Sequence, residues 1–321
     1  MLSRVADALY WMARNLERAE NNSRVLSVQL ISMLEADEAT MLDQDWEEII
    51  EISASLADYH TRYGKLEATD IIQYLAFSGS NMNSVVNCMT YARENAKATR
   101  DMIPEQLWEV INGYYLDLAA VRKENATIQE VQQFLNDTNH TSMAAQGVVE
   151  STMTRGVPYT FIKIGKWMER AEKTARILNV VCEKALKEND TNKEMHFYNW
   201  LTALRMVNGH DAYIKENPPT MHSKDVLAFI ISEATFPRSI KYCMDHVMEA
   251  IENLERGKVS HYSEQLFEEL SSIHQTFSEM DIGELSLQEL MAFLDRFQNQ
   301  CLEVSRIFSE TYYLIEPLEM R

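Results

Sequence analysis

Residues 3–34 read SRVADALYWMARNLERAENNSRVLSVQLISML, and this stretch decides the fold class. Its apolar side chains recur every three or four positions, as at Val5, Leu9 and Met12, so they line one face of an α-helix. Ser3 can cap the first turn, because its hydroxyl accepts a hydrogen bond from a backbone N–H that the helix leaves unpaired. The stretch therefore predicts one long amphipathic helix.

The same periodicity continues along most of the chain, which has only 9 glycines and 6 prolines in 321 residues. Sheets and long loops use glycine and proline at their turns, so this scarcity favours helices joined by short connections. The sequence therefore predicts an all-α protein with a single domain, residues 1–321, of about twelve helices. The polar stretch KENDTNKE at 187–194 is the best candidate hinge, and two helical halves joined there are the alternative.

Three of the predicted helices cover residues 43–62, 127–149 and 195–215. A polar run at 137–142 marks a possible break in the second of them. Another helix follows the turn-rich segment SGSNMNS, where either Asn81 or Asn83 is expected to be the cap, because asparagine is favoured at that position.

Charge and cysteine content exclude several classes of protein. The net charge is −19, and so acidic a surface repels phosphate backbones and anionic lipids, so we expect no nucleic-acid and no membrane partner. The sequence also lacks the apolar core of a signal peptide and the ~18 uncharged apolar residues of a membrane span. Four cysteines, with no CxxC spacing, lie in apolar helical patterns: Cys88, Cys182, Cys243 and Cys301. They are expected to be reduced core residues of a cytoplasmic protein.

Several motifs of known chemistry are absent from the sequence. No two glycines lie within two positions of each other, which excludes glycine-rich phosphate loops. None of the 8 histidines has a glutamate three positions before it, as a di-iron helical bundle would need. The sequence also lacks HExxH and GxSxG. We therefore expect no metal and no cofactor, and the sequence leaves open whether the chain is an enzyme.

The first helix carries a polar stripe at spacings of three and four residues, made of Arg14, Glu17, Asn21 and Arg24, with Arg18 beside it. One interpretation is a solvated face whose ion pairs each contribute about 0.3–0.5 kcal/mol. The other is a buried Arg/Glu network that lines a cavity. Arginine would then bind a carboxylate or phosphate through its two-pronged guanidinium, and glutamate would act as a general base or orient arginine. Spacing alone leaves both interpretations open.

A second cluster spans two neighbouring predicted helices. Arg93, Asn95 and Arg100 lie on the first helix and are candidate ligand-binding residues. Trp108 lies on the next helix and is expected to be a core residue rather than a platform for a ligand.

A third cluster lies in FPRSIKYCMDH, residues 236–246. Pro237 is expected to open a helix and to place Arg238 in its first turn. A cation there opposes the helix dipole, so Arg238 would need an acidic neighbour or an anionic ligand, unless it is simply exposed.

The segment that carries the polar stripe is repeated later in the sequence. Residues 14–26 read RNLERAENNSRVL, and residues 166–178 read KWMERAEKTARIL. The tetrapeptide ERAE begins at Glu17 in the first copy and at Glu169 in the second. The shared register predicts two geometrically equivalent helices, although it does not by itself establish a duplicated fold.

Taken together, these segments resemble the bacterial Alpha-E family, which is named for its helices and its glutamates. The resemblance rests on segments in the family's order along the whole chain, at residues 2–24, 81–112, 155–178, 200–206 and 237–243. Three positions depart from the family's usual pattern, because Ala13 replaces glycine and Lys97 and Lys166 replace arginine. Lysine lacks the fork of arginine, which weakens the case for a bidentate contact at those two positions.

The resemblance implies a helical companion of circularly permuted ATP-grasp ligases and transglutaminase-like proteins, and hence a role in forming amide bonds on a small metabolite or peptide. In the first hypothesis, the chain is a partner of an ATP-grasp-type amide ligase and binds an acyl or amine group in an Arg/Glu-lined cavity. Glu17 and Glu169 would orient groups or transfer protons. The candidate ligand-binding residues, which would hold anionic groups, are Arg14, Arg18, Asn21, Arg24, Arg93, Asn95, Arg100, Arg170 and Arg238.

Two other hypotheses remain. The chain can be a non-catalytic helical scaffold whose Arg/Glu pairs are structural ion pairs and which docks its ligase or a peptide. It can also be a helical enzyme that uses glutamate-bound magnesium.

Overall fold

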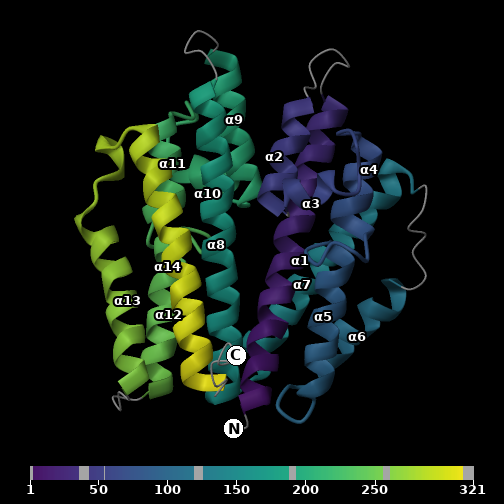
Figure 1. Ribbon diagram of the computed structural model, residues 1–321, viewed down its shortest axis with the longest axis vertical. Helices are drawn as coiled ribbons and strands as arrows, with labels where there is room; N and C mark the ends of the chain where they lie inside the picture. The colour runs from purple at the N-terminus through teal and green to yellow at the C-terminus, as the bar shows by residue number, and fades with distance from the viewer. Residues whose placement is uncertain are drawn as a thin grey trace, which may run out of the picture. The chain divides into compact units, whose positions relative to one another are not determined.

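The computed structural model describes residues 3–35, 43–53, 55–118, 126–187, 193–255 and 261–313. Over these ranges the chain forms fourteen α-helices, one π-helical turn and one 3-10 turn, and it has no strand (Figure 1). The all-α prediction is therefore confirmed. Residues 188–192, the centre of the predicted hinge, lie outside the described residues.

The elements follow one another as α1 (Ser3–Glu35), α2 (Asp43–Ser53), α3 (Leu56–His60), α4 (Ala68–Ile72), the π-turn η1 (Gln73–Phe77), α5 (Val85–Ala98), α6 (Glu105–Leu118), α7 (Ile128–Thr152), α8 (Val157–Lys187), α9 (Lys193–Met206), α10 (His210–Glu216), α11 (Ser223–Ser232), α12 (Ile240–Glu255), α13 (His261–Glu279), the 3-10 turn η2 (Ile282–Glu284) and α14 (Leu287–Tyr313).

The chain divides into two compact units. The α7 unit comprises Met12–Thr154, and the α8 unit comprises Met1–Trp11 together with Arg155–Arg321. Helix α1 begins in the α8 unit and continues in the α7 unit. The predicted hinge at 187–194 falls inside the α8 unit, so the sequence boundary between the units lies elsewhere, at Thr154. The single domain and the hinge both stay predictions.

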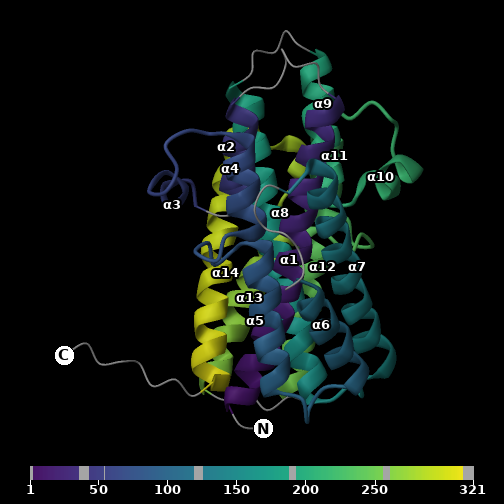
Figure 2. The ribbon, with the colours of Figure 1, turned by 90° about the vertical axis from the view of Figure 1, so that its right-hand side faces the viewer.

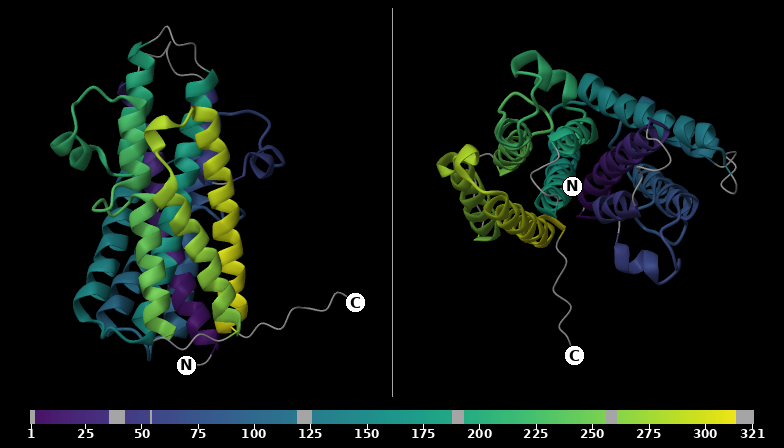
Figure 3. Two further views of the ribbon diagram at one scale, coloured as in Figure 1. Left: turned by 90° about the vertical axis from the view of Figure 1, so that its left-hand side faces the viewer. Right: turned by 90° about the horizontal axis from the view of Figure 1, so that it is seen from above.

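Four long helices build the α8 unit. Helix α8 packs against α12 and α14, and α13 packs against the same two helices, so the four close a ring (Figures 1 and 3). Aromatic side chains fill part of its core, where the ring centroids of Phe161 and Phe308 lie 5.7 Å apart. Tyr10, from the first turns of α1, also packs on Phe308, at 5.3 Å.

In the α7 unit, α6 packs against both α5 and α7 and lies between them in Figure 2. Phe77 of η1 packs on Phe134 of α7, with ring centroids 4.8 Å apart. Helix α7 also joins α1, because the Ser142 hydroxyl donates to the Leu16 carbonyl at 3.3 Å. Since Ser142 is fully buried, this bond replaces water that its hydroxyl has lost.

Helix α7 runs unbroken through 137–142, so the predicted break there is wrong. The buried hydroxyls in this run find acceptors without disturbing the helix: Thr138 donates to its own helix at Phe134, at 2.9 Å, and Ser142 donates to α1. The helix start is fixed by Thr127, whose side chain accepts from the Glu130 N–H while the Glu130 carboxylate accepts from the Thr127 N–H.

Two helices predicted as continuous are interrupted. The predicted helix at 195–215 ends early because Asn208 adopts a left-handed conformation with φ 52°. The N–H of Asn208 then bonds to the Arg205 carbonyl and that of Gly209 to the Leu204 carbonyl, which is a Schellman C-cap. Glycine is needed next, since a Cβ at Gly209 would lie 2.9 Å from Phe236 Cζ. The predicted helix at 43–62 divides likewise, because Ser55 is extended and caps α3.

The cysteine prediction is confirmed, since Cys88, Cys182, Cys243 and Cys301 are all buried and free. None of the helices that the structure describes combines the length and the apolarity that crossing a bilayer requires.

These buried thiols should resist modification. Burial raises the pKa of the Cys182 thiol to about 12, and only the thiolate attacks a disulfide reagent. We expect no labelling of the native protein by an aromatic disulfide reagent at about pH 8, close to the pKa of a free thiol, and labelling of all four cysteines in guanidinium chloride. Rapid colour development with the native protein, followed by absorbance, would contradict the buried assignment.

Candidate functional site

The polar stripe of α1 lies in the interior of the protein. Glu17 is 0 % exposed and accepts two side-chain hydrogen bonds, from Gln146 Nε2 at 3.0 Å and from Asn21 Nδ2 at 3.3 Å. Arg14 and Asn21 are also buried. The interpretation of the stripe as a solvated face is therefore wrong for these residues, and α7 supplies one of the groups that compensate the buried charge.

A buried ion pair continues the stripe toward the C-terminal end of α1. Arg24 Nη1 lies 2.6 Å from Glu20 Oε1, and its Nη2 donates to Asn21 Oδ1. Removing one partner from a buried pair of this kind costs about 3–5 kcal/mol, because the other charge stays behind without compensation. Glu20 is not part of the stripe defined from sequence, but it is the direct partner of Arg24.

The other side of α1 reaches the turn that precedes α5. Arg18, which is half-buried, donates to the Asn83 side-chain oxygen at 3.4 Å. Asn22, one turn later, donates to the Asn83 backbone carbonyl at 2.8 Å. Ser84 then caps α5, and the Asn81 side chain accepts from the Asn83 N–H at 2.9 Å. The predicted Asn cap is therefore wrong by one to three residues, although both asparagines shape the turn.

The second ERAE copy makes the same kind of contact inside the α8 unit. Arg170 of α8 donates to the Pro237 carbonyl at 3.2 Å, and Thr174, one turn later, donates to the Arg238 carbonyl at 3.2 Å. Both acceptors lie in the turn that precedes α12. The Arg of each ERAE motif thus ties its own helix to the start of a neighbouring helix in the same unit.

The turn before α5 and the turn before α12 contain the same hydrogen bonds around a capping serine. Asn83-Ser84-Val85 and Arg238-Ser239-Ile240 occupy equivalent positions, and each serine hydroxyl accepts from the N–H three residues later, at 3.2 Å and 3.0 Å respectively. In both copies the N–H of the serine donates to the carbonyl three residues earlier, at 2.9 Å.

A cysteine completes each turn. Cys88 Sγ lies 3.9 Å from the Met82 carbonyl, and Cys243 Sγ lies 3.7 Å from the Pro237 carbonyl. The predicted equivalence of the two ERAE helices is therefore supported by a second, independent set of contacts. Sequence inspection missed this set, although the spacing S-[VI]-x-x-C-M appears twice and could have shown it.

The remaining candidates of the α8 unit are also buried. Glu169 is 3 % exposed and Arg238 is 8 % exposed. Arg238 does not lie in the first turn of a helix as predicted, because α12 begins at Ile240. The equivalence of the two repeated segments does not extend to Arg176. Arg176 is exposed, whereas its counterpart Arg24 is buried.

Arg93 and Arg100 form a separate cluster with aromatic rings of α6. The Arg100 guanidinium carbon lies 4.8 Å from the Trp108 ring centroid, and that of Arg93 lies 5.4 Å from Trp108 and 4.8 Å from Tyr115. Arg93 also donates to Asn112 Oδ1 at 3.1 Å. Trp108 is half-buried and contacts two guanidinium groups, so its assignment to the core is wrong. These contacts join α5 to α6.

Asn95 is half-buried and Arg100 is exposed, and neither shares a described contact with the α1 stripe. Within the α7 unit, the candidates of α1 and the Arg93–Arg100 aromatic cluster are therefore separate groups. Arg170 and Arg238 belong to the α8 unit, where both lie at the turn before α12.

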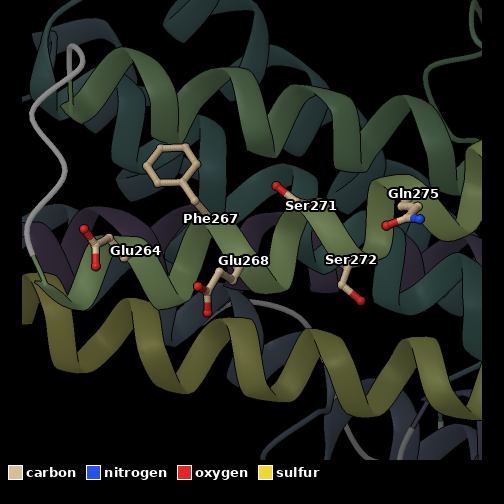
Figure 4. Close-up of a pocket in the computed structure, with 6 residues that line it drawn as sticks. All are labelled: Glu264, Phe267, Glu268, Ser271, Ser272 and Gln275. Atoms are coloured by element: carbon tan, nitrogen blue, oxygen red, sulfur yellow. The ribbon is translucent and has the colours of Figure 1, made fainter.

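Two surface grooves are lined by none of these residues. One follows α13 and is lined by that helix alone, with Glu264, Phe267, Glu268 and Ser271 among its residues (Figure 4). A surface formed by a single helix cannot enclose a ligand. The other groove lies between α6 and α7. Within the described ranges, no three His, Cys, Asp or Glu side chains converge as metal ligands would.

The fold and this geometry define an all-α protein with a duplicated Glu-Arg helix, each copy tied to the capped start of a neighbouring helix. The chain belongs to the Alpha-E family, described as a predicted alpha-helical domain with a conserved ER motif, and the match covers residues 1–313. No match is found among curated proteins or among solved structures. The two Glu-Arg pairs of this chain are Glu17-Arg18 and Glu169-Arg170.

The duplicated contact can be tested where it depends on one hydroxyl. Thr174→Val keeps the shape of the side chain but leaves the Arg238 carbonyl without this donor, so we expect the free energy of unfolding to fall by about 1–3 kcal/mol. The matched control is Thr160→Val on the same helix, whose hydroxyl bonds only to the preceding turn at Gly156. Urea unfolding followed by circular dichroism measures both. Equal effects of the two substitutions would show that the tie to the α12 turn contributes nothing.

Proposed function

We propose that this protein is a non-catalytic helical partner of an ATP-grasp-type amide ligase, and that its buried Arg/Glu groups keep its helices in place rather than bind substrate. The partner class rests on the family resemblance. The structural role of the Arg/Glu groups rests on one observation, that both ER arginines are engaged by the turn before a neighbouring helix of their own unit.

The chemistry of these contacts favours a structural role. A turn before a helix carries carbonyl groups that cannot bond within the helix, and a buried carbonyl without a donor costs about 1–3 kcal/mol. Arg170 and Thr174 supply donors to two such carbonyls in succession. A guanidinium that already donates to the backbone has fewer N–H groups left for a substrate carboxylate.

The glutamates of the first motif fit the same role. Glu17 receives amide donors from α7 and from its own helix, and Glu20 receives the guanidinium of Arg24. The bond from Gln146 joins α7 to α1, and the pair within α1 compensates a charge that would be costly to bury alone. The two grooves described above are lined by other residues.

A substrate-binding role is the second candidate, and the complete burial of Glu17 favours it, because buried carboxylates are also suited to proton transfer. The two roles predict different consequences for substitutions that keep the side-chain volume.

The experiment begins with affinity purification of the tagged chain from its native cells and identification of the ATP-grasp ligase that accompanies it. The wild-type complex is then compared with complexes of Glu17→Gln and Glu169→Gln, with Glu109→Gln on the exposed face of α6 as the control. If the role is structural, each variant that assembles should support the wild-type rate of amide formation per complex. A catalytic role predicts a loss of about 10²–10⁴-fold in the rate with unchanged assembly.

Thermal unfolding of the isolated variants keeps the two outcomes apart. We expect Glu17→Gln and Glu169→Gln to lower the unfolding temperature and Glu109→Gln to leave it unchanged, since only the first two carboxylates are buried. A variant that melts like the wild type but whose complex is inactive would refute the structural role. A chain that purifies without any ATP-grasp protein would refute the partner.

A further inference from the structure

Helix α10 projects from the α8 unit as part of a short flap, residues 208–221 (Figures 2 and 3). The flap contains α10 and the largely exposed stretch that follows it. Only three of its residues are buried, and these are Gly209, Tyr213 and Met221. A segment with so little buried surface lies at the low end of local stability, because few contacts oppose its opening.

Both ends of the flap have a left-handed backbone. Asn208, with φ 52°, and Met221, with φ 48°, are the two non-glycine residues with positive φ among those that the structure describes. Asparagine adopts this conformation readily, and Asn208 closes the C-cap of α9. Methionine does not, so the backbone at Met221 is strained, and burial of its side chain has to offset that strain. The closed flap therefore works against the local preference of its own backbone.

The anchor of the flap is also imperfect. Tyr213 is 0 % exposed and packs on Phe229 of α11, with ring centroids 5.4 Å apart. Its hydroxyl is buried, yet it has no hydrogen-bond partner among the described residues. Burial raises the pKa of Tyr213, and the charge of Asp225 raises it further, so the hydroxyl keeps its proton as an unused donor. A buried donor of this kind raises the free energy of the closed state, since opening returns the donor to water.

The flap covers a pair of stacked aromatic rings. Phe229 and Phe236 have ring centroids 4.7 Å apart, and both are largely buried. Tyr213 packs on Phe229, while Gly209 lies so close to Phe236 that a Cβ would come within 2.9 Å of its ring. Phe236 directly precedes Pro237, whose carbonyl accepts a hydrogen bond from the second ER arginine. Opening of the flap would expose both rings beside that turn.

We infer that the flap opens on its own about its two left-handed residues and uncovers the rings of Phe229 and Phe236, while the long helices of the α8 unit stay folded. Three observations support this inference: the small buried surface, the strained Met221 and the unpartnered hydroxyl of Tyr213. All three lie in the flap itself. The flap thus controls access to an aromatic surface, a property that goes beyond the proposed partner role and does not depend on it.

Hydrogen–deuterium exchange of the full chain, read by mass spectrometry, tests the flap. A helix of seven residues is too short to persist alone in water, so opening frees its backbone N–H groups. We expect exchange of residues 210–217 to be at least about a hundredfold faster than exchange in the centre of α8. Low concentrations of urea should change the flap rate little, because local opening exposes little surface, whereas exchange in α8 should accelerate.

Two tyrosine substitutions separate the flap from ordinary core packing. Tyr213→Phe removes only the unpartnered hydroxyl, so we expect exchange in the flap to slow about tenfold, equivalent to ~1.4 kcal/mol. The matched control is Tyr59→Phe, because Tyr59 is equally buried but its hydroxyl donates to the Lys65 carbonyl at 2.8 Å. The control should leave flap exchange unchanged and lower the urea concentration at the midpoint of unfolding.

A pair of substitutions at Met221 isolates the strain of the hinge. Met221→Ala and Met221→Gly both remove the buried side chain, but only glycine adopts the left-handed backbone without a steric cost. We therefore expect flap exchange to be about threefold faster in the alanine variant than in the glycine variant.

Three results would overturn the inference. The first is flap exchange with the rate and the urea dependence of α8, which would show that the segment opens only with the whole unit. The second is no slowing of flap exchange in Tyr213→Phe, which would show that the hydroxyl is satisfied in the closed state. The third is flap exchange no faster in Met221→Ala than in Met221→Gly, which would remove the strained hinge.

Discussion

The structure depends on how buried backbone carbonyls find donors at the start of a helix. A chain that enters a helix through a buried turn carries peptide oxygens that the helix itself cannot satisfy. In this protein a long neighbouring helix supplies the donors, from Asn22 in one unit and from Arg170 and Thr174 in the other. Arg18 donates instead to the side-chain oxygen of Asn83 in the same turn as the acceptor of Asn22. The contacts of the ER motif therefore have a physical explanation that does not require a substrate.

Much of the fold was predictable because helical periodicity is a local property. The long α1, the extent of α8 and the buried cysteines all follow from apolar residues at three- and four-residue spacing. One error arose where a tertiary contact decides: helix α7 continues through 137–142, where Ser142 finds an acceptor on α1 that local sequence does not reveal. The other error was local. Helix α9 ends at Met206 because the left-handed Asn208 closes a C-cap, and the pair Asn208-Gly209 is a stop signal that the prediction overlooked.

The candidate site was predictable in part, and for a similar reason. Residue spacing placed Glu17, Asn21 and Arg24 on one face of a helix, but spacing does not reveal whether that face is exposed to solvent. The face is buried, and Gln146 of α7 contacts Glu17 there. The α6–α7 groove could not be predicted from residue spacing, because its lining residues come from two different helices, such as Tyr114 of α6 and Phe134 of α7.

The two Glu-Arg helices make similar contacts, but exchanging the turns that they contact would remove a hydrogen bond. In the α7 unit, Arg18 uses the side-chain oxygen of Asn83, and the residue at the matching place before α12 is Arg238, which offers no side-chain acceptor. A chain with an internal repeat risks docking one repeat onto the wrong half during folding. A guanidinium in place of an amide raises the energy of that wrong pairing, so the divergence between the two turns favours assembly of each unit from its own segments.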